Sequence, residues 1–473
     1  MMSHWSGKRV LILGAARQGA ALARWLTQQG ASVTLSDSRP ESALSETRLA
    51  LQGLNITWAL GGHPLELLDQ TDVVCISGGV PTNIPILEEA VRRGIPLSND
   101  TQIFMEVVPC PTVGITGSAG KTTTTALVGE MAHAAFDPAA NQTGKVRQAF
   151  VGGNIGDPLL NHVDQMQADD LAILEISSFQ LEQMTISPNV AAVLNITPNH
   201  LDRHKSMDAY VAAKRRILEF QKAEDKAVLG RDDPGAWALK DSVKGQLHTF
   251  GMSHFAGPGD GTYYDDGILY LLDRGVDIPL LRRDKISLRG DHNVLNVLAA
   301  FAIGHAAGLP LDAMLHAAEA FRGMPHRLEL VRELNGVRWF DDSIATTPER
   351  VIAAIESFEE PIVLMLGGRD KDLPWADLAH LVCQRVDHVV LFGEAAGKIE
   401  LALHAAGAKG RAAAGRPYSV AQAAHLHQAV DLAYQAAATG DVVLLSPGGT
   451  SFDEFKDFEE RGERYQAWVQ ALS

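Results

Sequence analysis

A glycine-rich segment that ends in Lys and Thr carries the clearest chemical signal in the sequence. It occupies residues 117–122, after a β-branched run at 112–116 and before a stretch expected to be helical. In such a loop, backbone N–H groups bind phosphate oxygens, the Lys reaches the terminal phosphates and the Thr hydroxyl binds Mg²⁺. The strict pattern is not met, because Ile115 stands where its first glycine belongs. A glycine-rich turn with a surface lysine is the alternative. We predict an ATP site formed by Gly117, Ser118, Ala119, Gly120, Lys121, Thr122 and Thr123.

Three further side chains bear on this chemistry. Glu175 ends an apolar run at the sheet edge where α/β proteins bind ligands, and its carboxylate suits Mg²⁺. A solvated glutamate at a strand end is the alternative. His200 follows a second apolar run, and a lone histidine in such a turn is usually a polar residue with ordinary hydrogen-bond partners. Lys214 lies beside two arginines in an expected helix, which taken alone indicates a solvated face.

The N-terminal segment carries a second glycine turn. An apolar run at residues 10–13 leads into Gly14 and then Gly19, and Asp37 follows the next strand, about where a dinucleotide-binding unit has its ribose acid. Ala16 stands at the middle glycine, and its methyl group obstructs close approach of a pyrophosphate. Backbone N–H groups at the helix start still suit a phosphate. The turn is compatible with a nucleotide or nucleotide sugar, with NAD, or with a purely structural role.

A repeated strand-then-helix pattern must position these segments. Short β-branched runs alternate with longer Ala- and Leu-rich stretches, which predicts parallel sheets with helices on both faces. The Gly- and Asp-rich stretch 257–267 is expected to be a surface loop. The predicted strands are 10–13, 33–36, 73–77, 112–116, 171–175, 190–195, 362–366, 389–392 and 442–445.

The length of 473 residues predicts about three domains at ~100–200 residues each. Proline-containing segments at 107–111 and 321–325 mark the expected boundaries. We predict an α/β protein with a Rossmann-like domain over residues 1–106, a central phosphate-loop ATPase-like parallel-sheet domain over 107–323, and a Rossmann-like domain over 324–473.

Composition and charge exclude several classes of protein. The chain is 46% hydrophobic and 21% charged with a net charge of −16, which disfavours disorder and the binding of nucleic acid or anionic membranes. Three widely spaced cysteines argue against a disulfide framework or a zinc ribbon. No segment reaches ~18 consecutive apolar residues. We expect a cytoplasmic monomer with small-molecule substrates.

The phosphate loop has the variant pattern T-G-x-x-G-K-[ST]-T of the Mur ligases and folylpolyglutamate synthetases, which form amide bonds. Matching segments occur along nearly the whole chain, so the sequence resembles this family, and most of all the Mur ligases that add glutamate to UDP-N-acetylmuramoyl-L-alanine. The most similar part is residues 451–458 with Arg461 and Gly462. The other matches are Gly152–Gly156, Glu175–Leu181, 195–204, 212–214, His292, Asn293, Asn296, 325–329, 341–343 and 446–453.

The resemblance implies catalytic roles for four residues. Lys121 would act on the phosphates, and Mg²⁺ ions at two sites would be bound by Thr122, Glu175, His200 and Lys214. An ammonium cannot bind Mg²⁺, which prefers oxygen ligands. In the family the matching lysine is carbamylated by CO₂, which makes it a carboxylate-like ligand, and this lysine is Lys214.

The resemblance also implies the remaining contacts with ATP and with the UDP-linked substrate. Arg327 follows the middle domain, so contact with ATP would couple nucleotide binding to domain closure. A departure is the run 77–81, Ser-Gly-Gly-Val-Pro, where the family usually has Ser-Pro-Gly. The further ATP residues are Asn293, Asn296, Arg327 and Asp342; the residues implied for the UDP-linked substrate are Gly14, Arg17, Gln18, Asp37, Ser38, Arg39, Ser77 and Asn154.

The implied glutamate site contains one important departure. Many family members have a lysine where this chain has Ile344, and that lysine helps to hold the incoming glutamate. Lys371 matches a second amino-acid-binding lysine, and Arg369 is a further source of positive charge. The implied glutamate contacts are Thr346, Lys371, Ser451 and Phe458.

We therefore expect an ATP- and Mg²⁺-dependent ligase that adds D-glutamate to UDP-N-acetylmuramoyl-L-alanine through an acyl phosphate. This reaction serves peptidoglycan precursor synthesis, and so cell-wall biogenesis, cell shape and cell division. Alternatives are a ligase that adds L-glutamate, a folylpolyglutamate synthetase-like ligase and a nucleotide-binding subunit without catalysis. The separate nucleotide-type N-terminal domain disfavours the folate enzymes, and the intact Lys121, Glu175, His200 and Lys214 disfavour a non-catalytic subunit.

Overall fold

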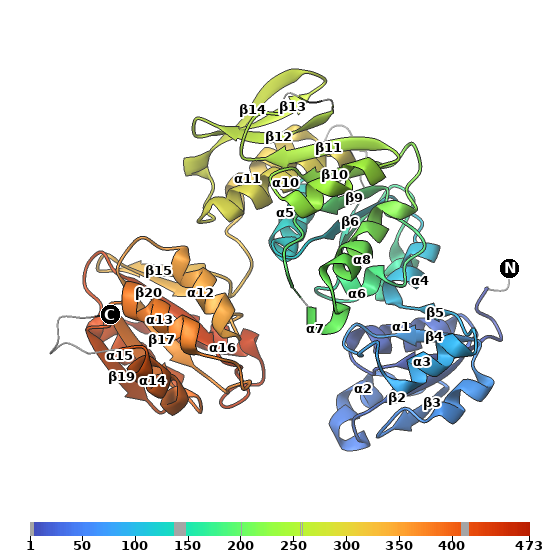
Figure 1. The fold of residues 1–473 in the computed structure, drawn as a ribbon, viewed down its shortest axis with the longest axis horizontal. Coiled ribbons are helices and arrows are strands. Elements are labelled where there is room, and N and C mark those ends of the chain that lie inside the picture. Colours follow the sequence, from blue (N-terminus) through green and yellow to red (C-terminus); the bar gives the residue numbers. More distant parts are fainter. Residues whose placement is uncertain (1–3, 137–147, 200, 256, 258, 408–415) are drawn as a thin grey trace. The chain divides into compact units, whose positions relative to one another are not determined.

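The computed structural model describes residues 4–136, 148–199, 201–255, 257, 259–407 and 416–473. The chain forms two compact units, residues 1–321 and 322–473, each described here by itself (Figure 1). The first unit contains a five-stranded and a nine-stranded sheet, and the second contains a six-stranded sheet. The predicted α/β class, with three largely parallel sheets, is confirmed. The domain boundaries at 106/107 and 323/324 remain a proposal.

The N-terminal sheet is entirely parallel, in the order β3-β2-β1-β4-β5. Along β1, Val10 and Ile12 enter one apolar core with α1, while Leu11 and Leu13 enter another with α3. Burial on both faces explains why this strand is a continuous apolar run. The elements are β1 (Arg9–Leu13), α1 (Arg17–Gln28), β2 (Ser32–Asp37), α2 (Ser45–Ala50), β3 (Ile56–Leu60), β4 (Val73–Ile76), α3 (Pro85–Arg92), β5 (Leu97–Ser98) and α4 (Asp100–Val107).

The central sheet has the order β14-β13-β12-β11-β10-β9-β6-β8-β7, and it is parallel from β7 to β12. Helices α5, α10 and α11 pack together over one apolar core, while α6 and α8 pack against each other. The elements are β6 (Thr112–Thr116), α5 (Lys121–Phe136), β7 (Ala149–Gly153), β8 (Leu171–Glu175), α6 (Ser178–Leu181), β9 (Val190–Val193), α7 (Leu201–His204), α8 (Met207–Glu219), β10 (Lys226–Gly230), α9 (Pro234–Trp237), β11 (Gln246–Gly251), β12 (Asp260–Asp265), β13 (Ile268–Asp273), β14 (Val276–Arg282), α10 (Asp291–Ala307) and α11 (Leu311–Ala320).

The expectation of a loop at 257–267 is wrong for most of that stretch. Residues 260–265 form β12, which pairs with β13, and β13 pairs with β14 in a second antiparallel hairpin. Asp266 and Gly267 both have positive φ, 42° and 80°, as the two central residues of a tight hairpin turn require. The Asp-Gly pair was therefore a hairpin signal, hidden by the general Gly and Asp content of the segment.

The second unit has the strand order β15-β16-β20-β17-β18-β19, with only β15 antiparallel to its neighbour among the described strands. One apolar core lies under α12, α13 and α14, and another lies under α15 and α16 on the opposite face. The elements are β15 (Glu329–Leu334), β16 (Val337–Asp341), α12 (Pro348–Glu356), β17 (Ile362–Gly367), α13 (Ala376–Arg385), β18 (His388–Phe392), α14 (Ala396–Ala405), β19 (Ser419–Ala423), α15 (Leu426–Ala436), β20 (Val442–Gly448) and α16 (Phe458–Ala471).

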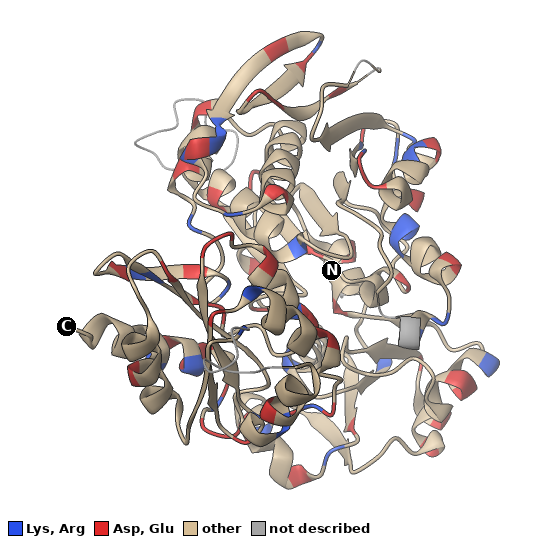
Figure 2. Ribbon diagram, turned by 60° about the vertical axis from the view of Figure 1, so that its left-hand side comes forward, with Lys and Arg blue, Asp and Glu red and all other residues tan. Residues whose placement is uncertain are grey.

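Charged residues are distributed over all three sheets and their helices. Figure 2 shows acidic and basic positions interspersed along the described ribbon, in keeping with the net charge of −16. Among the described residues, none of the helices combines the length and the apolar character needed to cross a bilayer.

Candidate active site

The glycine-rich loop joins the carboxyl end of β6 to the start of α5. The Lys121 side chain folds back over it, donating to the carbonyl oxygens of Gly117 at 2.8 Å and Ser118 at 3.3 Å. Asn195, just after β9, binds the loop from the next strand, since its Oδ1 accepts from the Ala119 N–H at 2.8 Å. Polar contacts thus fix the loop at the sheet edge where α/β proteins bind ligands.

Gly120 is required by its backbone conformation and by its neighbour. Its φ is +82°, which disfavours any side chain, and a Cβ here would clash with Oδ1 of Asn296. Asn296, from α10, therefore lies against the loop, and its Nδ2 donates to Oδ1 of Asn293 at 3.0 Å. These two predicted nucleotide residues are thereby brought together at the start of α10.

Glu175 lies at the end of β8, the strand next to β6, and its side chain is buried. Thr122 Oγ1 donates to its Oε2 at 2.8 Å, and Asn154 Nδ2 donates to its Oε1 at 2.9 Å. The two predicted metal ligands, Thr122 and Glu175, are therefore neighbours. Asn154, predicted at the UDP-linked substrate, also contacts the candidate metal carboxylate.

Lys214 is 1% exposed and lies at the same loop. Its Nζ donates to the Gly117 carbonyl at 2.9 Å and to Thr116 Oγ1 at 3.3 Å, and it stands 4.7 Å from the centre of the Tyr210 ring. Burial and then the charge of Lys121 lower the pKa of Lys214 to about 7, against the opposing effect of Glu175. A buried amine with this pKa has a substantial neutral fraction near pH 7.

The burial of Lys214 contradicts the solvated face suggested by its two arginine neighbours. Its helix buries one stripe at helical spacing, and Lys214 stands in the middle of it; the members are Tyr210, Ala213, Lys214, Ile217 and Leu218. This periodicity was a signal that sequence reasoning missed. Tyr210 itself adds a contact, since its hydroxyl lies 3.0 Å from Ser118 Oγ. His200 lies outside the described residues.

The N-terminal glycine turn is built as tightly as its sequence suggests. A Cβ at Gly19 would clash with the carbonyl oxygen of Gly14, and one at Gly14 would lie 2.9 Å from Ser77 Cβ. Gln18 accepts the N–H of Gly78 at 2.9 Å. The turn and the Ser77 loop are thereby fixed to each other.

Asp37 braces this turn. Its Oδ2 accepts the Ala15 N–H at 2.7 Å, and Arg39 binds both of its oxygens at 2.9 Å. Burial by itself raises the pKa of Asp37, but the hydrogen bonds from Arg39 and Ala15 outweigh it and lower the pKa to about 2. Ser38 is exposed beside them, and Arg17 donates to the Gly156 carbonyl at 3.1 Å.

An unassigned residue joins the Ser77 loop to the central sheet. Arg203 donates to the Val80 carbonyl at 2.9 Å, and its guanidinium carbon lies 3.8 Å from the centre of the Phe179 ring. A small hollow lined by Ser77, Gly78, Phe179 and Arg203 lies at this junction.

In the second unit, two predicted nucleotide-binding residues, Asp342 and Arg327, lie near each other. Asp342 is buried, and its oxygens accept from Ser446 Oγ at 2.7 Å and the Leu328 N–H at 3.3 Å. Burial raises the pKa of Asp342 to about 7, against the Ser446 hydrogen bond and the positive charge of Arg327. Arg327 thus lies close enough to Asp342 to influence its charge.

The predicted glutamate residues lie among positive charges. Lys371 Nζ donates to Thr346 Oγ1 at 3.3 Å. Burial lowers the pKa of Lys371, and the charges of Arg350 and Arg461 lower it further. Such a group of cations suits an anionic ligand.

Arg461 is the member of this group that sequence reasoning left without a role. It is fully buried, donates to the carbonyls of Gly449 at 3.1 Å and Ser343 at 2.7 Å, and burial lowers its pKa to about 10. Arg369, in contrast, forms a two-bond ion pair with Glu394 at 2.8 and 3.0 Å, so its charge is already compensated. Ser451 is buried, and Phe458 packs edge-on to His326.

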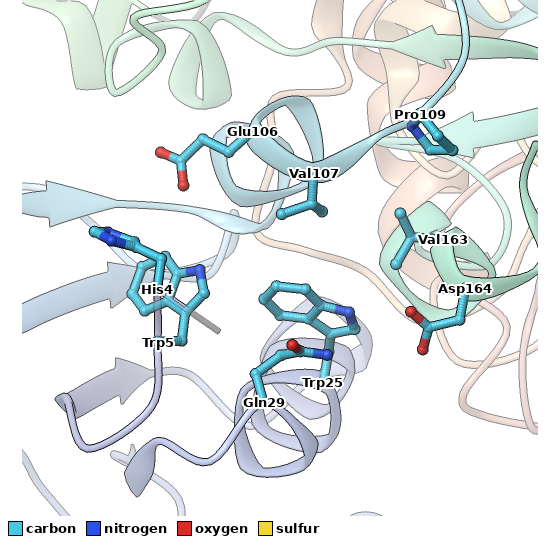
Figure 3. Close-up of a pocket in the computed structure, with 9 residues that line it drawn as sticks. All are labelled: His4, Trp5, Trp25, Gln29, Glu106, Val107, Pro109, Val163 and Asp164. Atoms are coloured by element: carbon cyan, nitrogen blue, oxygen red, sulfur yellow. The ribbon is translucent and has the colours of Figure 1, made fainter. Parts of the chain in front are cut away.

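A separate hollow of about 630 Å³ lies on the first unit, between the N-terminal segment, α1 and α4 (Figure 3). Its lining includes two tryptophans, Trp5 and Trp25, and two acidic residues, Glu106 and Asp164. Val107, Pro109 and Val163 also line it. None of its lining residues belongs to the predicted sites, so size alone does not identify the active site here.

Comparison with known proteins identifies the family of the chain. Models of the MurD-like N-terminal domain, the Mur ligase middle domain and the Mur ligase glutamate ligase domain match residues 8–99, 115–304 and 326–449. Proteins named UDP-N-acetylmuramoylalanine–D-glutamate ligase from Symbiobacterium thermophilum and Trichlorobacter lovleyi are 38% and 40% identical, over 98% of this chain and 98% and 99% of theirs.

Solved structures share the fold at lower identity. A UDP-N-acetylmuramate-alanine ligase, MurC, from Thermotoga maritima has a TM-score of 0.56 at 20% identity, covering 98% of this chain and 99% of its own. MurF from Acinetobacter baumannii has a TM-score of 0.57 at 16% identity, covering 98% and 92%. Full-length identity at this level shows that the chain belongs to the Mur ligase family, in its MurD-like branch.

Proposed function

We propose that this chain is an ATP-dependent ligase that adds D-glutamate to UDP-N-acetylmuramoyl-L-alanine in peptidoglycan precursor synthesis. The observation that carries the proposal is the meeting of Lys121, Thr122 and Glu175 with the buried Lys214 at the ends of adjacent parallel strands. Relatives at 38–40% identity over the full length carry the name of this activity, which disfavours the L-glutamate and folate alternatives.

The chemistry requires activation, because a carboxylate is a poor electrophile. ATP transfers its terminal phosphoryl group to the alanyl carboxylate, the glutamate amine attacks the acyl phosphate, and the tetrahedral adduct expels phosphate. Lys121 neutralises charge on the phosphoryl group during transfer. Bound Mg²⁺ supplies further neutralisation at the phosphate oxygens.

The donor set fits Mg²⁺. Thr122 and Glu175 offer neighbouring oxygens, and the Glu175 carboxyl group is buried beside the loop. His200 and Lys214 are the further proposed ligands. An unmodified ammonium does not fit, so we infer that Lys214 is carbamylated.

The environment of Lys214 supports this modification. CO₂ reacts with a neutral amine: an N–C bond forms, the nitrogen loses a proton, and a carbamate anion results. A lysine with an ordinary pKa near ~10.4 is almost entirely protonated at pH 7. Lys214, with its pKa lowered to about 7, has a far larger neutral fraction.

The substrate assignments rest on the resemblance and on local contacts. Gly14, Gln18, Asp37, Arg39 and Ser77 form one braced turn suited to the UDP-linked substrate, with Arg17 and Ser38 beside it. Asn154 is proposed both for this substrate and for orienting Glu175, to which it donates a hydrogen bond. Asn293, Asn296, Arg327 and Asp342 are proposed for ATP.

For glutamate, we propose that Lys371 supplies the charge that Ile344 does not. A carboxylate buried without a cationic partner would lose several kcal/mol on desolvation. Arg350 and Arg461 add positive potential at Lys371. Thr346, Ser451 and Phe458 complete the proposed site.

Phosphate release by the purified protein tests the function. With ATP, Mg²⁺ and UDP-N-acetylmuramoyl-L-alanine, D-glutamate should release phosphate and yield the glutamyl product, and L-glutamate should not. Phosphate release with L-glutamate but not with D-glutamate would contradict the proposed specificity. No phosphate release with either enantiomer would contradict the proposed function. We also propose that the enzyme is monomeric and cytoplasmic. Sedimentation of the purified protein tests whether it is a monomer.

A further inference from the structure

A histidine-carboxylate cluster lies on the central sheet, away from the residues of the proposed active site. His248 on β11, Asp260 on β12 and His305 on α10 each offer one ligand atom, and these atoms all lie within 4.8 Å of one another. His305 Nε2 stands 3.9 Å from Asp260 Oδ2 and 3.6 Å from Asp273 Oδ1. Ligand atoms around a tetrahedral Zn²⁺ are separated by about 3.3 Å, given bonds of about 2.0–2.1 Å. Small side-chain rotations therefore suffice to reach ligand geometry.

The backbone fixes this meeting. His248 and Asp260 are direct partners in the parallel pairing of β11 with β12, so their side chains project from the same face of the sheet. Helix α10 packs against β11 and β12 (Figure 1). Thr262, two residues after Asp260, donates to the Leu298 carbonyl at 2.7 Å, and His305 lies two helical turns after Leu298. Strand and helix thus present the two histidines and Asp260 to one another.

His248 supplies an independent sign of a ligand. Its side chain is 4% exposed, and its Nδ1 has no hydrogen-bond partner among the described residues. Its ring lies edge-on to the His305 ring, with centroids 6.0 Å apart. Buried polar atoms are nearly always satisfied, and an exception indicates a missing partner.

A second cluster in the chain shows the contrast. His326, Glu329 and Asp341 are also close enough to bind a metal, but His326 Nδ1 already lies 2.8 Å from Asp341 Oδ2. Gln466 bonds to both carboxylates at 3.0 Å. That cluster is a closed hydrogen-bond network and has no unsatisfied ligand atom of this kind.

We propose that His248, His305 and Asp260 form a structural site for a divalent transition metal of borderline softness, and that Zn²⁺ is the metal that fits it best. Two imidazoles and one carboxylate suit Zn²⁺, whereas Mg²⁺ prefers all-oxygen ligands. Asp273 adds a second negative charge, and Lys226 is a nearby cation whose ammonium binds the Ala306 carbonyl. The metal would fasten the end of α10 to β11 and β12. Asn296 lies nine residues earlier in this helix, about 13 Å along the axis, so the site is separate from the phosphate loop.

Zinc binding to the metal-stripped full-length protein tests the proposal, with Mg²⁺ in excess throughout. Wild type should bind one more Zn²⁺ per chain in equilibrium dialysis than His305→Gln or Asp260→Asn. The control is His254→Gln, which removes an exposed histidine of the same sheet region and should retain the wild-type stoichiometry. Both test positions are partly exposed, and equal circular dichroism in chelator would show that the variants fold.

Two further measurements distinguish a built site from surface binding. Zn²⁺ should raise the melting temperature of wild type and His254→Gln more than that of the two test variants. Co²⁺ in place of Zn²⁺ should give the visible absorption of a tetrahedral centre only in the proteins that retain the cluster. Equal Zn²⁺ stoichiometry in wild type and both test variants, or an equal loss in His254→Gln, would overturn the proposal.

Discussion

The ammonium of Lys214 donates a hydrogen bond to the carbonyl oxygen of Gly117 over 2.9 Å, so a buried lysine lies at the first residue of the phosphate loop. Lys121 donates to the same oxygen at 2.8 Å. Two lysine side chains therefore meet at one carbonyl oxygen, and Lys214, whose pKa burial and the charge of Lys121 lower to about 7, is the one proposed to react with CO₂.

Lys214→Ala should abolish ligation and leave ATP binding largely intact, because it removes the proposed carbamate ligand and not the phosphate loop. Added acetate should restore part of the activity by supplying a carboxylate. Arg215→Ala, an exposed change on the same helix, is the control and should keep wild-type turnover. Full activity in Lys214→Ala would refute the assignment.

The lowered pKa of Lys214 also predicts a pH dependence of stability. Its pKa is about 7 in the folded chain and 10.5 in the reference state, so between these values the unfolded chain binds a proton that the folded chain does not. Stability contributed by this group therefore rises with pH across that window, by at most about 1.4 kcal/mol per pH unit. In CO₂-free buffer, the urea midpoint of Lys214→Met should exceed that of wild type most below pH 7, and the difference should shrink towards pH 10. Parallel curves for the two proteins would mean that Lys214 does not change charge there.

Lys121→Ala should reduce turnover by ~10²-fold or more, since it removes the charge that follows the transferred phosphoryl group. Lys222→Ala is a matched surface control. Single-turnover product formation separates chemistry from product release, and an unchanged rate in Lys121→Ala would show that the loop does not act on the phosphates.

Lys371→Ala should raise the KM for glutamate much more than the KM for ATP or the UDP-linked substrate. Arg369→Ala is the control, because the Arg369 guanidinium is already paired with Glu394, and it should change the glutamate KM little. Ile344→Lys should remain folded and tighten D-glutamate. An unchanged glutamate KM in Lys371→Ala would mean that another group holds the carboxylate.

Gly19→Ala should destabilise the first unit by several kcal/mol or prevent its folding, because the new Cβ would clash with the Gly14 carbonyl oxygen. Gly79→Ala adds the same methyl group where no atom lies within 4 Å and should leave the melting temperature nearly unchanged. Equal melting temperatures for the two variants would show that the turn can relax.

Much of the fold follows from local pattern. All nine predicted strands are present, because strands buried on both faces must be continuous apolar runs, and Gly14, Gly117 and Gly120 mark the turns after two of them. The remaining strands were not predicted, and the strand at 260–265 was taken for a loop, because Gly and Asp residues dominate the composition of its segment.

The site was only partly predictable, for a different physical reason. The phosphate loop and Glu175 could be recognised from the sequence, because each lies at the end of a predicted strand. Arg461 was given no role, and the contact between Asn154 and Glu175 was not foreseen. Both contacts join residues far apart in the sequence, since Arg461 donates to the carbonyl oxygen of Ser343. Lys214 was assigned from the family pattern. Its burial follows from the row of buried residues along its helix, which the charges of Lys214 and its arginine neighbours made hard to recognise in the sequence.

The two oxygens of Glu175 are each occupied by an internal donor, Thr122 on one side and Asn154 on the other. Each carboxylate oxygen keeps a further lone pair for a cation, so these donors fix the orientation of the carboxylate toward the proposed ion. The carboxylate is consequently solvated by the chain itself in the absence of metal. The internal hydrogen bonds thus orient the Glu175 carboxylate before any ligand binds, so the proposed metal site is preorganised by the fold.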